Sequence, residues 1–261
     1  MTDIRISNWN ELQERLFQNA WDEGLGRYRS RYAFRGLSRA SYELKTSLQR
    51  LGPLYAELER HSLRNFRKYA HRDAAPGDSV WSWLSVAQHH GLPTRLMDWT
   101  YSPYIAMHFA TVNIDRFNED AAIWCVNYEA AHLLLPERLS GVLTDEGAHV
   151  FTVEMLGKAA GTLEEFQKLG DREFVVFLEP PSLDSRIVNQ YALFSVMSSA
   201  SASFDQWLHE FPDLWFRVIV PAELKWEIRD KLDQANITER VLFPGMDGLS
   251  LWLKRHYSPR R

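Results

Sequence analysis

Apolar residues recur at every third or fourth position in several stretches of the chain, which is the period of an amphipathic helix. The first helix is expected at about residues 8–23, because Asn8 can cap its start and Glu11 completes a capping box. Pro53 opens a long helix that reaches about His71, since proline suits a first helical turn. The same signals predict further helices over 80–91, 102–114, 222–236 and 248–257.

Other stretches alternate between two residue types or form short apolar runs, and these patterns predict strands. Over 27–37, basic and aromatic residues alternate up to Gly36. The run 173–181 is typical of a buried strand and ends at two prolines. Strands are also expected over 121–128 and 216–220, and 186–196 is expected to be a strand or a strand after a turn, whereas 92–101 is expected to be irregular.

These elements together predict an α+β fold. Helices dominate the first half of the chain and strands are more frequent in the second half. We therefore expect a helix-rich N-terminal half packed on a mixed β-sheet. No repeat or low-complexity linker divides the sequence, so one domain is expected over 1–261, with the helix at about 8–23 as an N-terminal extension.

The composition is that of a folded protein and narrows the chemistry. With 34 acidic and 30 basic residues the net charge is -4, which disfavours a general nucleic-acid binder. No stretch approaches the ~20 apolar residues that span a bilayer, and the start lacks a secretory signal pattern. We therefore expect a cytoplasmic protein without membrane contact.

The potential metal ligands in the sequence are few. A single cysteine, Cys125, excludes a multi-cysteine zinc site and lies in an apolar run, so a buried, inert thiol is expected. His89 and His90 are adjacent, and neighbouring residues on a helix point about 100° apart. The pair is therefore poorly placed to bind one ion, and no metal is expected.

Polar residues are concentrated in the segment between the helices expected at 80–91 and 102–114. An irregular segment fixed between two helices holds polar groups at defined positions, as binding sites require. The alternative is a structural role, in which Arg95 pairs with Asp98 and the hydroxyl groups of Thr100 and Ser102 cap the second helix. The residues alone leave both interpretations open for Thr94, Arg95, Asp98, Thr100 and Ser102.

The order of several motifs resembles the FRG-domain family, which is named for a Phe-Arg-Gly motif. That motif is Phe34, Arg35 and Gly36 in the run YAFRGL. It is followed in the family's order by TSLQR, HHGLPTRLMDWTYSPYIAMHFA, SRIVNQYALFSV and LFPGMDGLS. The resemblance extends from about Tyr32 to Leu253 and so covers most of the chain.

A second resemblance concerns the layout of ADP-ribosyltransferases of the Arg-Ser-Glu type. These enzymes have an arginine on an early strand, then a Ser-Thr-Ser strand that leads into a helix, and finally a late glutamate. Arg35 matches the first element. Thr100 and Ser102 match polar positions of the second element, although Trp99 replaces the first small hydroxyl residue of that element.

The third element has two candidates, Glu173 before an apolar strand and Gln190 in the run NQYALF. Gln190 would not serve as the same catalytic carboxylate. The resemblance implies an ADP-ribosyltransferase-like fold, NAD as substrate and an unknown macromolecular acceptor, in a bacterial or phage-related toxin or defence effector. It implies catalytic roles for Arg35 and for Glu173 or Gln190. The residues that it implies for binding a nucleotide-type molecule are Arg35, His90, Thr94, Arg95, Asp98, Thr100, Ser102 and Tyr104.

The chemistry of NAD cleavage explains why these residue types suit such a site. Breaking the nicotinamide–ribose bond builds positive charge on the ribose, as in glycoside hydrolysis, and a nearby carboxylate stabilises that charge. An arginine binds the diphosphate through charge-assisted bonds. We predict a pocket lined by Arg35, the segment 95–102 and Gln190. Tryptophans that flank the segment are expected to form its walls, namely Trp81, Trp83 and Trp99.

Two other functions and one structural alternative compete with this prediction. Arg35 could instead be a buried structural arginine paired with Asp98. A non-enzymatic recognition domain could use the aromatic residues of its surface. A nucleic-acid-binding or nucleotide-processing module could use basic residues at helical spacing on the long helix, which are Arg60, Arg64, Arg67, Lys68 and His71.

Overall fold

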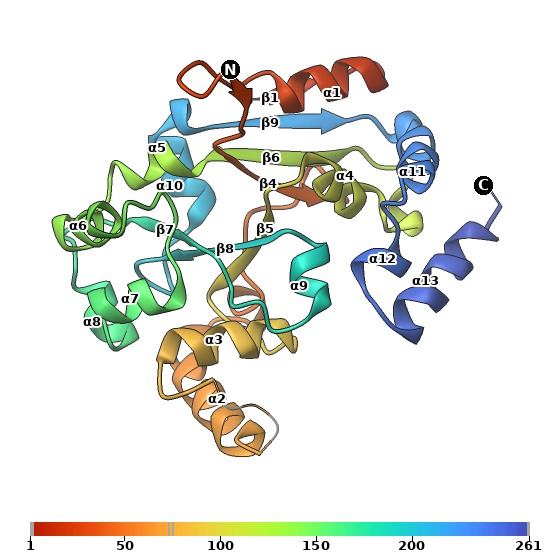
Figure 1. The fold of residues 1–261 in the computed structure, drawn as a ribbon. Coiled ribbons are helices and arrows are strands. Elements are labelled where there is room, and N and C mark those ends of the chain that lie inside the picture. Colours follow the sequence, from red (N-terminus) through yellow and green to blue (C-terminus); the bar gives the residue numbers. More distant parts are fainter. Residues whose placement is uncertain (1–2, 73, 75, 260–261) are drawn as a thin grey trace.

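A mixed seven-stranded sheet forms the centre of the computed structural model, which describes residues 3–72, 74 and 76–259 (Figure 1). Neighbouring strands are antiparallel throughout, except that β1 and β9 are parallel. A short antiparallel pair, β2 (Trp21–Asp22) and β3 (Arg27–Tyr28), lies outside this sheet. The order across the sheet is β1 (Asp3–Arg5), β9 (Trp215–Val220), β6 (Ala121–Asn127), β4 (Tyr32–Leu37), β5 (Leu96–Thr100), β8 (Ala192–Met197) and β7 (Val175–Leu178).

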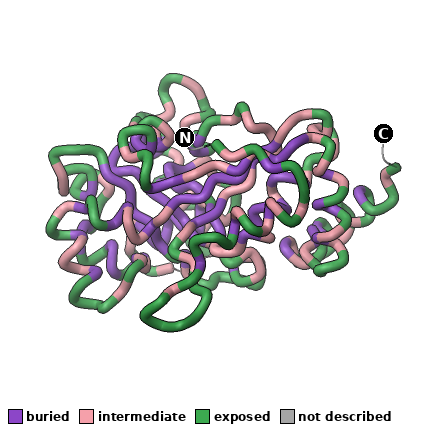
Figure 2. The backbone as a smooth tube through the Cα atoms, turned by 90° about the horizontal axis from the view of Figure 1, so that it is seen from above, coloured by how far each residue is buried: buried purple, intermediate pink, exposed green. Residues whose placement is uncertain are grey.

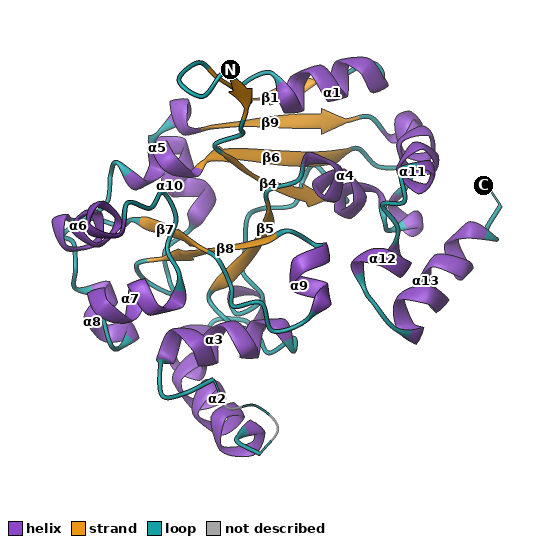
Figure 3. Cartoon of the chain, viewed as in Figure 1, coloured by secondary structure: helices purple, strands orange, loops and turns teal. Residues whose placement is uncertain are grey.

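Helices surround the sheet and cover its apolar surfaces (Figure 3). Seen from above, the buried backbone runs through the middle and the exposed backbone forms the outer loops and helices (Figure 2). The helices are α1 (Trp9–Phe17), α2 (Tyr55–Ala70), α3 (Val80–His89), α4 (Pro103–Thr111), α5 (Tyr128–His132), α6 (Glu137–Glu146), α7 (Val153–Ala159), α8 (Leu163–Gln167), α9 (Ser185–Asn189), α10 (Phe204–Glu210), α11 (Lys225–Gln234), α12 (Glu239–Leu242) and α13 (Met246–His256).

Three buried apolar clusters fill the spaces between the sheet and its helices. One lies between α1, α4, α11 and one face of β4, β6 and β9, and contains Phe34, Met107 and Ile228. A second lies on the opposite face of the sheet and includes Trp99 and Trp215. The third joins the β5, β8 and β7 region to α3, α6 and α7. The predicted single-domain α+β fold with a mixed sheet is confirmed, but the expected division of the chain is wrong, because β1 to β6 lie in the first half and helices α6 to α13 lie in the second.

Two of the predicted helix caps form in the structure. Asn8 accepts a hydrogen bond from the Glu11 amide at the start of α1, and Ser102 accepts one from the Ile105 amide at the start of α4. However, the Glu11 carboxylate accepts from Ser7, so the expected reciprocal capping box does not form. The first helix also ends at Phe17 instead of about residue 23, because the chain from Trp21 turns back to form β2 and β3.

The expected irregular segment 92–101 is wrong over its second half, where Leu96–Thr100 forms β5. Four of these five residues are buried, because β5 is covered on both faces, and the period-two pattern is therefore missing. The strand expected over 186–196 also begins too early. Its first part is helix α9, and β8 starts at Ala192.

Candidate functional site

A pocket of about 380 Å³ lies where strands β4 and β5 separate. β4 pairs with β6 along its whole length, but its pairing with β5 is confined to Phe34 opposite Thr100. The interior edge of β5 is thus left without a strand partner beyond that point. The predicted pocket is present, and Arg35, Gln190 and residues 98–100 of the segment 95–102 line it, together with Gln88 and Arg186.

Arg35 fills part of the gap between the two strands. Its guanidinium donates a hydrogen bond to the backbone carbonyl of Asp98, a group that a continuing β4–β5 ladder would otherwise use. Its Nε is buried and has no hydrogen-bond acceptor. Burial lowers the pKa of Arg35, and the negative charge of Asp98 opposes that effect. The alternative in which Arg35 forms an ion pair with the Asp98 carboxylate is wrong, because the contact is with the main chain.

Gly36 allows helix α4 to cross close over β4 beside the pocket. A Cβ atom at this position would lie 1.9 Å from the Ala106 carbonyl oxygen and 2.6 Å from the Ala110 nitrogen. Both are backbone atoms that cannot move aside without displacing the helix. The glycine of the Phe-Arg-Gly motif is therefore required by packing, and this packing brings Phe109 of α4 to the pocket wall.

Asp98 presents the carboxylate of the pocket. It is the exposed residue of β5, and its neighbours along the strand are buried. The Gln88 side-chain amide of α3 donates to Asp98 Oδ2 over 2.8 Å, and the Thr94 hydroxyl donates to the Gln88 carbonyl oxygen over 2.6 Å. Thr94 thus orients Gln88, and Gln88 orients Asp98. Among the described residues, Asp98 forms no ion pair.

Helix α9 and the turn after it form the opposite wall. The Thr100 hydroxyl donates to the Gln190 carbonyl oxygen over 2.8 Å and so ties this wall to β5. His89 Nε2 lies 2.8 Å from Asp184 Oδ2, and Asp184 also caps α9 by accepting from the Arg186 and Ile187 amides. Hydrogen bonds from α3 and β5 therefore hold α9 in place over the pocket.

Five residues that the resemblance implied for ligand binding lie outside the pocket wall, and one of them is Thr94, whose hydroxyl bonds to Gln88. Arg95 points away from it and forms a buried bidentate pair with Glu59 of α2, so the alternative Arg95–Asp98 ion pair is wrong. Ser102 caps α4, and the Tyr104 hydroxyl accepts from Gln13 and lies among the aromatic rings of α1. His90 is exposed at the end of α3.

The two candidates for the third element are far apart. Gln190 lines the pocket, whereas Glu173 precedes β7 and accepts a hydrogen bond from Ser198, just beyond β8. Ser198 lies four residues along the chain from Phe194, the last β8 residue of the pocket wall, which corresponds to about 13 Å of extended strand. The structure therefore brings Gln190 towards Arg35 and leaves Glu173 at the other end of the sheet.

The tryptophans that were expected to form the walls have different positions. Trp81 and Trp83 lie in the apolar core, where their ring nitrogens donate to the carbonyls of Ala160 and Gly77. Trp99 borders the pocket, but its ring nitrogen is bonded to Ser195 in the core. Cys125 is fully buried, as expected, and burial raises the pKa of its thiol.

Sequence reasoning missed several residues of the pocket. Gln88 and His89 precede His90 on the same helix, but only the last was chosen from the histidine pair. Gln190 was predicted, but Arg186, which lies one helical turn before it, was missed because the run was interpreted as a strand. Asp184 had a usable signal, because aspartate is a preferred cap two residues before Arg186 on a short helix.

The basic face expected on the long helix is reduced in the structure. Arg60 pairs with Glu164, and the Arg67 guanidinium lies 5.6 Å from the centre of the Trp83 ring. Arg64 and Lys68 remain exposed on α2. Within the described part of the chain, no helix is long and apolar enough to cross a membrane, and no three His, Cys, Asp or Glu side chains are grouped to hold a metal ion.

Comparison with known proteins identifies the region that forms most of the pocket wall. The model of the FRG domain matches residues 30–119, which contain β4, α2, α3, β5 and α4. This match includes Arg35, Gln88, Asp98 and Thr100, whereas the wall formed by α9 lies beyond it. No curated protein and no solved structure matches the chain. The resemblance to the FRG-domain family that was inferred from the motifs is therefore confirmed over residues 30–119.

Proposed function

We propose that the pocket binds a nucleotide-type anionic molecule and that the chain is an NAD-consuming enzyme, either an ADP-ribosyltransferase or an NAD glycohydrolase. The observation that supports this most directly is that one pocket contains two arginines and a carboxylate without ion-pair partners in the described structure. Arg35, Arg186 and Asp98 are these residues. Charged groups held in a cleft without neutralising partners are typical of sites that bind a charged ligand.

The two arginines supply the binding of the diphosphate. Arg35 has one side-chain nitrogen committed to the Asp98 carbonyl and a buried Nε without an acceptor. The Arg186 guanidinium lies 5.0 Å from the centre of the Phe243 ring, and this contact holds it in position but leaves its charge without a carboxylate partner. Arginine donates charge-assisted, often bidentate hydrogen bonds to phosphate, so both residues suit a diphosphate.

Asp98 supplies the carboxylate for the ribose. Positive charge that develops on the ribose as the nicotinamide bond breaks would be stabilised by this group. Gln88 fixes one carboxylate oxygen and leaves the other for the substrate. Apolar residues of the pocket wall, Phe34, Phe109 and Phe194, provide surfaces against which the nicotinamide ring can pack. A volume of about 380 Å³ lies within the range of small-molecule sites.

The test is nicotinamide release from NAD by the purified chain and by three variants. Arg35→Ala and Asp98→Asn are each expected to lower turnover by roughly 10²-fold or more, since each removes a charge from the reacting region. Glu173→Gln is the matched control, because this carboxylate lies at the other end of the sheet, and it is expected to keep wild-type turnover. Full activity in Asp98→Asn together with loss in Glu173→Gln would reverse the assignment.

A second measurement separates transfer from hydrolysis and tests the biological role. Labelled NAD incubated with cell extract is expected to leave label on a macromolecule if the chain is a transferase, and free ADP-ribose if it is a glycohydrolase. Production of the protein in the cytoplasm of bacterial cells is expected to deplete NAD and stop growth if it is a toxin or defence effector. NAD binding without turnover would assign the pocket to non-enzymatic recognition.

Nucleic acid is the alternative partner and has its own test. Arg64 and Lys68 of α2 are the exposed basic residues on which such binding would depend. Phosphate contacts release counterions, so the affinity would fall steeply with salt. A filter-binding titration over a range of salt concentrations, with Arg64→Ala as comparison, would show this slope if α2 binds nucleic acid.

A further inference from the structure

The pocket wall formed by α9 is held from behind by α12. Asn189 Nδ2 donates to the Val241 carbonyl over 2.8 Å, and Gln190 Nε2 donates to the Leu242 carbonyl over 2.9 Å. Figure 1 shows α12 beside α9, and the two helices are in contact. Gln190 lines the pocket, whereas Asn189 does not. The position of this wall therefore depends on where α12 lies.

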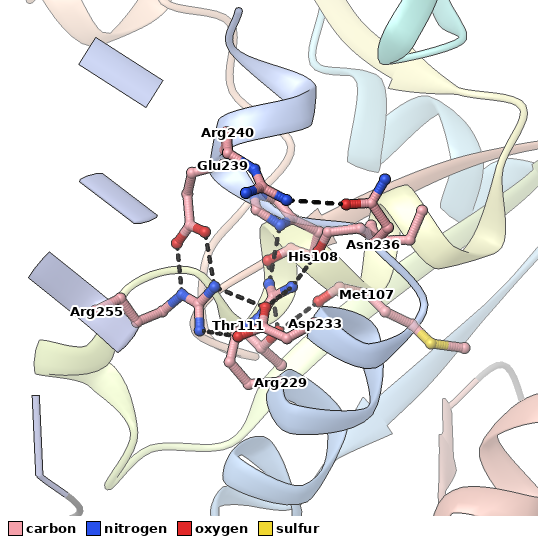
Figure 4. A network of polar contacts seen from close by, with 10 residues as sticks. Met107, His108, Thr111, Arg229, Asp233, Asn236, Glu239, Arg240 and Arg255 are labelled. Carbon is pink, nitrogen blue, oxygen red and sulfur yellow. Dashed lines mark hydrogen bonds and ion pairs between the residues drawn. The ribbon is translucent and has the colours of Figure 1, made fainter. Parts of the chain in front are cut away.

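Helix α12 has too few residues to hold its position alone. It spans Glu239–Leu242, and Thr238 before it forms no side-chain cap. Such a short helix depends on contacts with the rest of the protein. A buried network that we call the C-terminal clamp supplies these contacts, and it consists of Arg229, Asp233, Glu239 and Arg255 (Figure 4).

Arg255 of α13 is the centre of the clamp. It donates to both carboxylate oxygens of Glu239 over 2.6 and 2.8 Å, and to both oxygens of Asp233 over 2.8 and 2.7 Å. Arg255 is 6% exposed and Glu239 is 2% exposed. One guanidinium thus joins the end of α11, the start of α12 and α13. Both of its ion pairs are well shielded from solvent.

Arg229 extends the clamp to α4 and to the segment before α12. This fully buried residue lies 2.9 Å from His108 Nδ1 of α4, and its other terminal nitrogen donates to the Ile237 carbonyl. The residue after His108 is Phe109, which lines the pocket. The clamp is therefore linked to the pocket both through α4 and through α12 and α9.

We propose that Arg255 is a positioning residue for the pocket, which acts through Glu239 and α12 to hold Gln190 and Arg186 of the α9 wall in place. This proposal rests on the function proposed above only for the identity of the ligand. Arg255 itself is not in the pocket wall. Its removal should therefore loosen α9 selectively and weaken ligand binding, while the central strands keep their structure.

Amide hydrogen exchange without ligand tests the positioning directly. In Arg255→Lys the amides of Gln190 and Tyr191, which bond within α9, are expected to exchange at least tenfold faster, while those of β6 are unchanged. Lys231→Ala is the matched control, because it breaks an exposed ion pair with Glu227 on α11. Unchanged exchange in α9, or an equal rise in α9 and β6, would overturn the proposal.

Asn189→Ala provides a second variant that leaves the buried clamp intact. It is expected to weaken NAD binding about tenfold in calorimetry, although Asn189 does not line the pocket. If Arg255 acts through α12, the effects of Arg255→Lys and Asn189→Ala on α9 exchange should be less than additive in the double variant. Full additivity would contradict the proposed route. Absence of NAD binding in the unmodified chain would refute the proposed substrate, while the exchange data would still decide the role of Arg255.

Discussion

The pocket and the C-terminal clamp both contain arginines and carboxylates, but the contacts of these groups differ. In the clamp, Arg255 is paired with two carboxylates and both of its neighbours are shielded. In the pocket, Arg35 bonds to a backbone carbonyl and Asp98 to a neutral amide. The charged groups of the clamp pair with one another. The charged groups of the pocket have no ion-pair partner in the described structure and are available to a ligand.

Arginines in the two regions therefore have different roles. The sequence assigned both Arg95 and Arg35 to the same site, but Arg95 resembles the arginines of the clamp, since Glu59 neutralises it in the core. A buried ion pair becomes strongly destabilising when one partner is removed, because the other charge is left uncompensated. An arginine in a pocket can be removed at a smaller cost in stability and a larger cost in function.

The largest effect on stability is expected at the centre of the clamp. Arg255→Met leaves the buried Glu239 without its cation, while Asp233 keeps only its longer contact with Arg229, and the change should lower the free energy of unfolding by about 3–5 kcal/mol. Urea denaturation measures this change. Lys231→Met breaks an exposed pair on the same helix as Asp233 and should change stability by about 0.5 kcal/mol or less. Similar values for the two variants would show that the clamp is not a structural ion-pair network.

A loss of stability of intermediate size is expected at acidic pH, and His108 is the group responsible. Burial, reinforced by the charge of Arg229, lowers the pKa of His108 to about 3, well below the value of about 6.5 for an unfolded chain. Between these values the unfolded chain binds more protons than the folded chain, so stability falls as the pH falls. The expected loss from this group is about 2 kcal/mol between pH 6.5 and pH 5, because each pH unit contributes at most about 1.4 kcal/mol.

His108→Asn tests the origin of this acid sensitivity. Asparagine places an oxygen acceptor where Nδ1 receives the hydrogen bond from Arg229, and it cannot be protonated. The stability of this variant, measured by urea denaturation at several pH values, should fall less between pH 6.5 and pH 5. His71→Asn, at an exposed position, should keep the wild-type pH profile. An unchanged slope in His108→Asn would refute the assignment.

The sequence predicted the parts of the site whose signals are local. Ser102 is a cap followed by proline, and Phe34 to Gly36 form a short motif on a recognisable strand. The strand β5 was missed because burial on both faces removes the alternation that marks a strand. The partner of Arg95 lies 36 residues away on α2. The sequence favoured the nearby Asp98 as this partner, but the packing of α2 places Glu59 against Arg95 instead.

The other wall of the pocket could not be predicted for a related reason. Gln190 bonds to a carbonyl 52 residues later in the chain, and no local pattern encodes that contact. The choice between Glu173 and Gln190 likewise depends on where β7 and β8 pair. Antiparallel pairing of β7 with the far end of β8 carries Glu173 away from the pocket, although its spacing before an apolar strand resembles the enzyme motif.

The smallest effect on stability is expected at Asp98, where the effect on function is expected to be large. Asp98→Asn keeps a carbonyl oxygen that can accept from Gln88, and no ion pair of the described structure is lost. Its free energy of unfolding should therefore lie within about 0.5 kcal/mol of the wild type, as for an exposed surface substitution. Urea denaturation and NAD turnover measured on the same preparation give the comparison. A loss of turnover with unchanged stability would place Asp98 among the groups held ready for a ligand, whereas a loss of several kcal/mol would make it a structural carboxylate like Glu239.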